Sequence, residues 1–113
     1  MNGGAAAEAL AASFLQARGL EIVARNYRCR GGEIDLVARD GSTLVFVEVR
    51  LRRGSAFGGA AASITAAKRR RLAHAARHYL GRLGSEPPCR FDAILLDNLA
   101  SARIEWLRDI AST

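Results

Sequence analysis

Two neighbouring segments, residues 32–39 and 43–50, constrain the fold of this chain more than any other part of it. Apolar and polar residues alternate along both, many of the apolar ones are β-branched, and Asp40-Gly41 lies between them. Alternation with a period of two is typical of strands, and Asp-Gly between two such segments favours a tight turn. The sequence therefore predicts an antiparallel β-hairpin with Asp40-Gly41 as its two-residue loop.

The charged residues of this hairpin are expected on one face. With this loop, Asp35 pairs with Phe46 and Glu33 with Glu48. Because side chains alternate along a strand, the two glutamates, Asp35 and Arg50 project from the same side. The opposite side is apolar and forms core, with Ile34, Leu36, Ala38, Val45, Val47 and Val49. Asp35 and Glu48 then become diagonal neighbours, with Cα atoms roughly 7–8 Å apart.

Two carboxylates at this spacing can converge on one cation. Glu33 directly opposite Glu48 is a like-charge pair, which costs stability unless a positive charge lies between them. Mg²⁺ relieves such repulsion and prefers a few carboxylate oxygens together with water. The alternative is a solvated face that is merely acidic, although Leu44 and Phe46 lie on the same side and make a fully wet surface a poorer description.

The same residues carry a resemblance. Glu33-Ile34-Asp35 followed by Glu48-Val49-Arg50 resembles the split acidic motif of the PD-(D/E)xK nuclease superfamily. With the flanking Gly32, Leu36 and Phe46-Val47, the pattern is more closely similar to the YraN family, small bacterial proteins related to archaeal Holliday-junction resolvases. The resemblance extends from the N-terminal helix to Arg90-Phe91-Asp92. It departs at Arg50, where the family usually has lysine.

This resemblance implies a metal-dependent endonuclease that acts on phosphodiester bonds of DNA, including branched or junction DNA. Asp35 and Glu48 would hold Mg²⁺ or Mn²⁺, with Glu33 and Glu8 as accessory acids. Glu8 comes from the first helix, where a glutamate near the N-terminus also has the simpler role of favouring the helix dipole. Arg50 can bind phosphate oxygens and offset charge, but it cannot lose a proton and so cannot serve as a general base.

The basic residues favour a polyanion as partner. The chain has 17 Lys and Arg against 11 Asp and Glu, a formal charge of +6, and nucleic acid is the commonest cytosolic polyanion. The residues predicted to contact nucleic acid are Arg52, Arg53, Lys68, Arg69 and Arg70. Lys68 also continues the apolar stripe of its helix, where a lysine usually snorkels. The resemblance implies the alternative, that Lys68 reaches the carboxylates as a catalytic group. Solubility alone is the competing explanation for the charge.

The remaining composition places the chain among small cytoplasmic proteins. A length of 113 residues suits a single domain, residues 1–113, and no apolar run reaches the roughly 18 residues of a membrane span. The first residues lack the basic region of a signal peptide. Cys29 and Cys89 are expected to be free thiols in a reducing compartment. His74 and His78 have the spacing of two metal ligands on a helix but no third ligand, so structural roles are expected.

Helices are predicted over residues 3–18 and from Ser63 or Thr65 to Leu83, and strands over residues 20–28, 90–97 and 102–107 in addition to the hairpin. Residues 51–62 contain three glycines without periodicity and are predicted to form a loop beside the acidic site. The predicted fold is α/β, a mixed sheet with helices on its faces. This order matches the αβββαβ core of restriction-endonuclease-like proteins that the resemblance implies.

Two other functions remain open from the sequence. The first is a nucleic-acid-binding protein that keeps the nuclease fold with weak or no catalysis, which Arg50 favours and the three hairpin acids oppose. The second is a basic structural protein of ribosomes or nucleoids, which leaves the acidic face unexplained. A homodimer is implied only through the resolvase resemblance, because a four-way junction has two strands to cut and twofold symmetry matches it.

Overall fold

The computed structural model describes residues 3–51, 64–97 and 103–110. Its elements follow the predicted order: α1 (Gly3–Ala17), β1 (Glu21–Cys29), β2 (Gly32–Asp40), β3 (Thr43–Leu51), α2 (Ala66–Leu83), β4 (Cys89–Leu96) and β5 (Ile104–Leu107). Thr65 caps α2 by accepting a hydrogen bond from the Lys68 amide. The predicted loop lies outside the described residues apart from Leu51, which ends β3.

The strands form one mixed sheet in the order β1-β2-β3-β4-β5. β1, β2 and β3 pair antiparallel, β4 runs parallel to β3 after the crossover through α2, and β5 returns antiparallel to β4. A parallel partner requires such a crossover, because a tight turn can only join antiparallel strands. The predicted αβββαβ arrangement is therefore confirmed, with β5 added at one edge.

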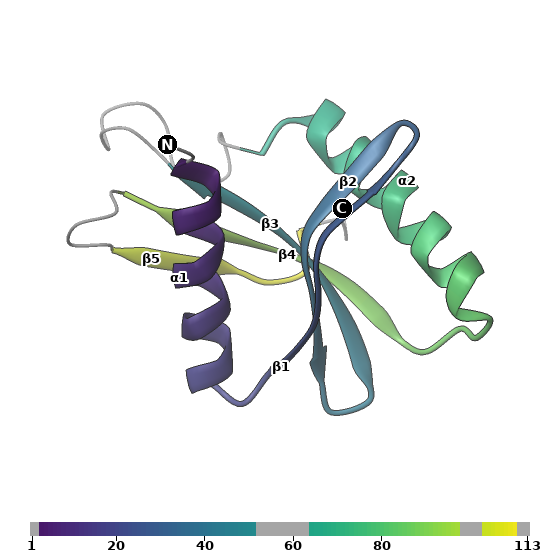
Figure 1. Ribbon diagram of the computed structural model, residues 1–113, viewed down its shortest axis with the longest axis horizontal. Coiled ribbons are helices and arrows are strands. Elements are labelled where there is room, and N and C mark those ends of the chain that lie inside the picture. Colours follow the sequence, from purple (N-terminus) through teal and green to yellow (C-terminus); the bar gives the residue numbers. More distant parts are fainter. Residues whose placement is uncertain (1–2, 52–63, 98–102, 111–113) are drawn as a thin grey trace.

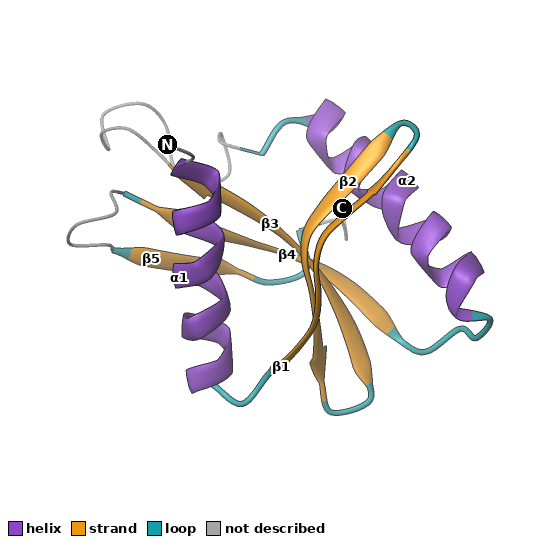
Figure 2. Ribbon diagram, viewed as in Figure 1, coloured by secondary structure: helices purple, strands orange, loops and turns teal. Residues whose placement is uncertain are grey.

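The two helices cover opposite faces of the sheet (Figures 1 and 2). Successive side chains of β2 and β3 point to opposite faces of the sheet. Leu36 and Val47 pack under α1, whereas Val37 and Phe46 pack under α2. Alanines at the buried positions of both helices let their backbones approach the sheet closely, at Ala7, Ala11, Ala12, Ala75 and Ala76. None of the helices within the described ranges is long and apolar enough to cross a membrane.

The register of the central hairpin differs from the prediction by two residues. Asp40 pairs with Thr43 and Val37 with Phe46, so the loop is Gly41-Ser42 rather than Asp40-Gly41. Gly41 has a positive φ of 63° and occupies the first loop position, where a turn of type II′ requires it. The predicted pair of Asp35 with Phe46 and the predicted pair of Glu33 with Glu48 are both wrong for this reason.

The regular alternation of side chains along β2 is broken at Asp35, so that residues before it point to the opposite face from the one expected. Leu36 and Ala38 pack under α1, but Ile34 joins the cluster under α2. The opposite residue of β1 is Asn26, which has a left-handed φ of 54° and interrupts the pairing between Arg25↔Leu36 and Tyr27↔Ile34. The pairing of β2 with β3 also ends at Leu36↔Val47. Beyond that point, β1 and the start of β2 bend together towards α2, as Figure 1 shows.

Contacts from α2 hold this bent hairpin in place. His74 Nε2 lies 2.9 Å from the carbonyl oxygen of Arg30, and His78 is hydrogen bonded to the Tyr27 hydroxyl. A carbonyl oxygen only accepts, so His74 Nε2 carries a proton. Both histidines therefore make contacts between elements of the fold, in agreement with the structural roles expected from the sequence.

Gly32 allows α2 to lie directly on the start of β2. A Cβ atom at this position would lie 2.3 Å from the carbonyl oxygen of Arg71. We therefore expect Gly32→Ala to displace α2 and to lower the free energy of unfolding by about 2–4 kcal/mol, in the range of overpacked cores and strained backbone. Urea denaturation followed by circular dichroism measures the loss. Gly81→Ala is the matched control, because a Cβ there meets no atom within 4 Å, and an equal loss in both variants would contradict the steric explanation.

Candidate active site

Two adjoining cavities lie where β2 separates from β3, beside the first turns of both helices. The first has a volume of about 220 Å³ and is lined by side chains of β2, β3 and α2. The second has a volume of about 390 Å³ and extends towards α1. Glu33, Glu48 and Arg50 line both cavities, which therefore form one continuous site with acidic and basic side chains in its lining.

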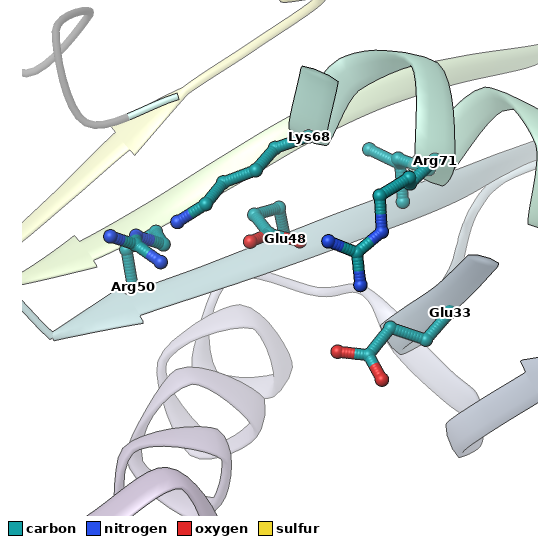
Figure 3. A pocket seen from close by; sticks show the side chains of 6 residues that line it. Glu33, Glu48, Arg50, Lys68 and Arg71 are labelled. Carbon is teal, nitrogen blue, oxygen red and sulfur yellow. The ribbon is translucent and has the colours of Figure 1, made fainter. Parts of the chain in front are cut away.

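The cavity beside α2 brings acids and cations face to face. Figure 3 shows Lys68 extending from α2 towards Arg50, and the Arg71 guanidinium between Glu48 and Glu33. The glutamates come from neighbouring strands, but they are not a cross-strand pair. Glu33 pairs instead with Arg28 of β1, with its Oε1 3.9 Å from Arg28 Nε and both side chains well exposed.

The cavity beside α1 contains Asp35 and Glu8. Both line it together with Asn26, Glu33 and Glu48. Glu8, which the sequence suggested as an accessory acid, thus lies in the same cavity as Asp35 and Glu48, beside the first residues of α1. Four carboxylates from three elements consequently share this space.

Asp35 is fixed by a backbone hydrogen bond. Its Oδ2 accepts from the Val49 amide at 2.8 Å, so the carboxylate takes the place of a ladder partner at the point where the two strands diverge. Burial raises the pKa of Asp35 to about 7, the Val49 hydrogen bond opposes the shift, and the negative charges of Glu48, Glu8 and Glu33 add to it. A carboxyl group that titrates near neutrality marks a site where charge is poorly compensated by the protein itself.

Glu48 is in a similar environment with more compensation. Burial raises its pKa, the Arg50 guanidinium lowers it, Glu33 raises it, Arg71 lowers it and Glu8 raises it. Arg50 is itself partly buried, and its Nε is a buried donor without a hydrogen-bond partner among the described residues. An unpaired buried donor costs free energy, and an anion entering the site would remove that cost.

The predicted basic residues are not all at the site. Lys68 lines the cavity beside α2, whereas Arg69 and Arg70 do not. Arg71 lines it and was missed in the sequence, although it lies three residues after Lys68 and so one turn along the same helix face. That spacing was the signal that could have identified it. Arg52 and Arg53 lie outside the described residues.

The carboxylates fit a cation that keeps much of its water. In the described part of the chain, no group of three or more His, Cys, Asp or Glu side chains is arranged to hold a metal ion by itself. Mg²⁺ commonly uses one or two carboxylates with several waters, whereas a protein cage of many ligands is typical of Ca²⁺. Asp35 and Glu48 are the side chains that could provide such a donor set. Burial raises the pKa of both, so their ionised forms would be poorly compensated by the protein itself.

Comparison with known families shows to which family this chain belongs. Residues 7–96 match the model described as "Uncharacterised protein family UPF0102". The chain belongs to this family. The matched range contains every residue of the two cavities except Gly4 and Ala5, so family and candidate site coincide in the sequence.

Individual UPF0102 proteins are similar over almost the whole chain. A UPF0102 protein of Methylobacillus flagellatus is 59% identical over 106 residues, which cover 94% of this chain and 93% of that protein. UPF0102 protein NE0719 of Nitrosomonas europaea is 55% identical, covering 96% and 92%. UPF0102 protein RALTA_A3032 of Cupriavidus taiwanensis is 62% identical, covering 93% and 79%. UPF0102 is the YraN family that the sequence motifs indicated.

Proposed function

We propose that this UPF0102 protein is a metal-dependent endonuclease that hydrolyses phosphodiester bonds of DNA. One observation carries the proposal: carboxylates from α1, β2 and β3 share one site with cations from β3 and α2. A phosphodiester requires both, because a hard cation needs oxygen ligands and the phosphate needs positive charge around it.

Asp35 and Glu48 would hold the cation, Mg²⁺ or Mn²⁺. The chemistry supplied by such a cation is polarisation of the phosphate and a lowered pKa of a coordinated water. Asp35 would give up its proton when the cation binds, because the positive charge would stabilise the carboxylate against the burial and the neighbouring negative charges that raise its pKa. Glu33 and Glu8 would accept hydrogen bonds from water and so orient it from the two sides of the site.

Three cations would position the phosphate. Arg50 would use its unpaired Nε and its permanent charge to bind phosphate oxygens. Lys68 and Arg71 would approach from α2, on the opposite wall of the cavity. Of the three, Lys68 alone would be able to give a proton from its Nζ to the leaving oxygen of the phosphodiester, a role that Arg50 cannot take.

Cleavage of a labelled panel tests this function. The panel contains duplex, single-stranded, flap and four-way-junction DNA, with Mg²⁺, Mn²⁺ or EDTA. We expect cutting that EDTA stops and that Glu48→Ala lowers by at least about 100-fold, since the variant loses a ligand of the cation that stabilises the transition state. Glu21→Ala is the matched control, because Glu21 pairs with Arg39 on the exposed surface, and its rate is expected to be unchanged.

A nucleic-acid-binding protein on the same fold is the second candidate. Arg50, at the position where related proteins usually have lysine, favours it. Salt-sensitive binding of the panel without cutting, equal in the Glu48→Ala variant, would select this candidate and reject the nuclease.

A further inference from the structure

A third cavity, separate from the carboxylates, lies between α2 and the turn that joins β1 to β2. Its volume is about 410 Å³, and its lining contains no acidic side chain among the described residues. The lining residues are Gly31, Ala67, Arg70, Arg71, His74 and Arg77. Three arginines around one cavity make a site of concentrated positive charge.

The charges of Arg70 and Arg77 are not neutralised by an ion pair within the described part of the protein. No carboxylate there forms an ion pair with Arg70 or Arg77, although other arginines of the chain have such partners: Arg28, Arg39, Arg90 and Arg103. Like charges on one helix face repel each other and cost stability. An anion in the cavity would relieve this repulsion.

The walls of the cavity are held at a fixed separation. The hydrogen bond of His74 to the Arg30 carbonyl ties the β1–β2 turn to α2 across the cavity. Gly31, on the turn side, keeps the space next to the His74 ring open, because a Cβ there would approach the ring to 3.3 Å. The arginines are therefore presented on a preformed surface.

Arg71 connects this cavity to the candidate active site, because it lines both. Arg70 and Arg77 are seven residues apart, or about 10.5 Å along the helix axis at about 1.5 Å per residue. A stacked nucleic-acid strand carries one phosphate per roughly 3.4 Å, so this length corresponds to about three phosphates. The described lining contains no Asn or Gln that could read a base edge, and the ring nitrogen Nε2 of His74, its one aromatic side chain, is already hydrogen bonded to the Arg30 carbonyl.

We infer that the groove formed by Arg70, Arg71, His74 and Arg77 binds the phosphodiester backbone of the strand whose reacting phosphate lies beside Glu48. The ligand is about three consecutive phosphates to one side of that reacting phosphate, bound without regard to base sequence. This inference rests on the proposed function for the position of the reacting phosphate.

Binding without metal tests the groove separately from catalysis. Fluorescence anisotropy of a labelled single-stranded DNA of 12 nucleotides is measured in EDTA over a range of NaCl concentrations. The slope of log K against log salt counts phosphate contacts, at about 0.7 per contact for single strands. We expect Arg70→Gln with Arg77→Gln to lower the magnitude of the slope by about 1.4 and to weaken binding about tenfold or more at 100 mM salt.

Arg82→Gln is the matched control, because Arg82 lies in the last turn of the same helix and lines a different cavity. Circular dichroism checks that all variants are folded. A slope in the double variant equal to that of the wild type would overturn the proposed role of the groove. An equal reduction of the slope per arginine in Arg82→Gln would do the same. If the protein cleaves DNA but the slope is unchanged in the double variant, the proposed nuclease activity stands and the proposed role of the groove is rejected. If the slope is lowered but no DNA is cleaved, the phosphate-binding role of the groove stands and the nuclease activity is rejected.

Discussion

Substitution of Asp35 by asparagine is expected to abolish metal-dependent cleavage and, at the same time, to stabilise the fold above pH 7. The amide oxygen of asparagine can still accept the hydrogen bond from the Val49 amide. What is lost is a negative charge that is half-buried and surrounded by Glu48, Glu8 and Glu33. Removal of an unfavourable charge with retention of its hydrogen bond raises the free energy of unfolding.

The raised pKa of Asp35 determines the sign of its contribution to stability at each pH. The folded-state pKa of Asp35, about 7, is above that of an unfolded aspartate, so the folded state binds the proton more tightly. The resulting stability is present below about pH 4 and is lost as the pH rises through 7. At pH 8 the ionised group costs on the order of 2 kcal/mol, after allowance for its partial exposure. Thermal melts from pH 4 to pH 8 should show this loss in the wild type and a smaller one in Asp35→Asn.

Metal binding gives the same experiment a second readout. At pH 8, millimolar Mg²⁺ or Mn²⁺ should raise the melting temperature of the wild type, because a ligand that binds only the folded state stabilises it. Asp35→Asn should be more stable than the wild type without metal and respond less to it, whereas the exposed variant Glu21→Gln should behave as the wild type. A variant that is less stable at pH 8, with an unchanged metal response, would show that Asp35 is a structural residue only.

Replacement of Asp92 by alanine should have the largest effect on stability. Asp92 is fully buried and accepts hydrogen bonds from Arg90 Nε, Trp106 Nε1 at 3.0 Å and the Asp109 amide at 2.9 Å. It thereby joins β4 to β5 and to the segment that follows β5. Truncation leaves the half-buried Arg90 guanidinium without this partner, and loss of one member of a buried ion pair typically costs 3–5 kcal/mol. The expected loss is a large share of the total stability of a domain this size.

The Asp40→Asn variant isolates the contribution of burial, because Asp40 also pairs with Arg90. Its Oδ2 lies 3.2 Å from Arg90 Nη1, but its side chain is 41% exposed. Exposed ion pairs contribute about 0–1 kcal/mol, so Asp40→Asn should lower the free energy of unfolding several times less than Asp92→Ala. Chemical denaturation of both variants measures the difference, and equal losses would contradict a special role of the buried carboxylate. Arg90-Phe91-Asp92, part of the motif that resembled YraN, thus has a structural explanation.

The element order, the mixed sheet and the membership of Glu33, Asp35 and Glu48 in one site could be predicted from the sequence. They depend on local periodicity, on capping residues and on the requirement that a parallel strand follows a crossover. The family was also visible in the acidic hairpin. The hairpin register was not, because Asp40-Gly41 and Gly41-Ser42 both allow a tight loop, and only the pairing across the sheet selects one.

Tertiary structure decided how the site is assembled. The change of facing direction at Asp35 depends on Asn26 of a different strand, and no pattern within β2 predicts it. Arg71 belongs to the site because Gly32 lets α2 lie directly on β2. The raised pKa of Asp35 likewise requires burial under α1 and the charges of three other acids. The sequence by itself therefore determined which elements carry the charged residues. Packing between distant elements determined which of those charges meet. The reason is that desolvation and Coulomb interactions depend on distances that local sequence patterns do not encode.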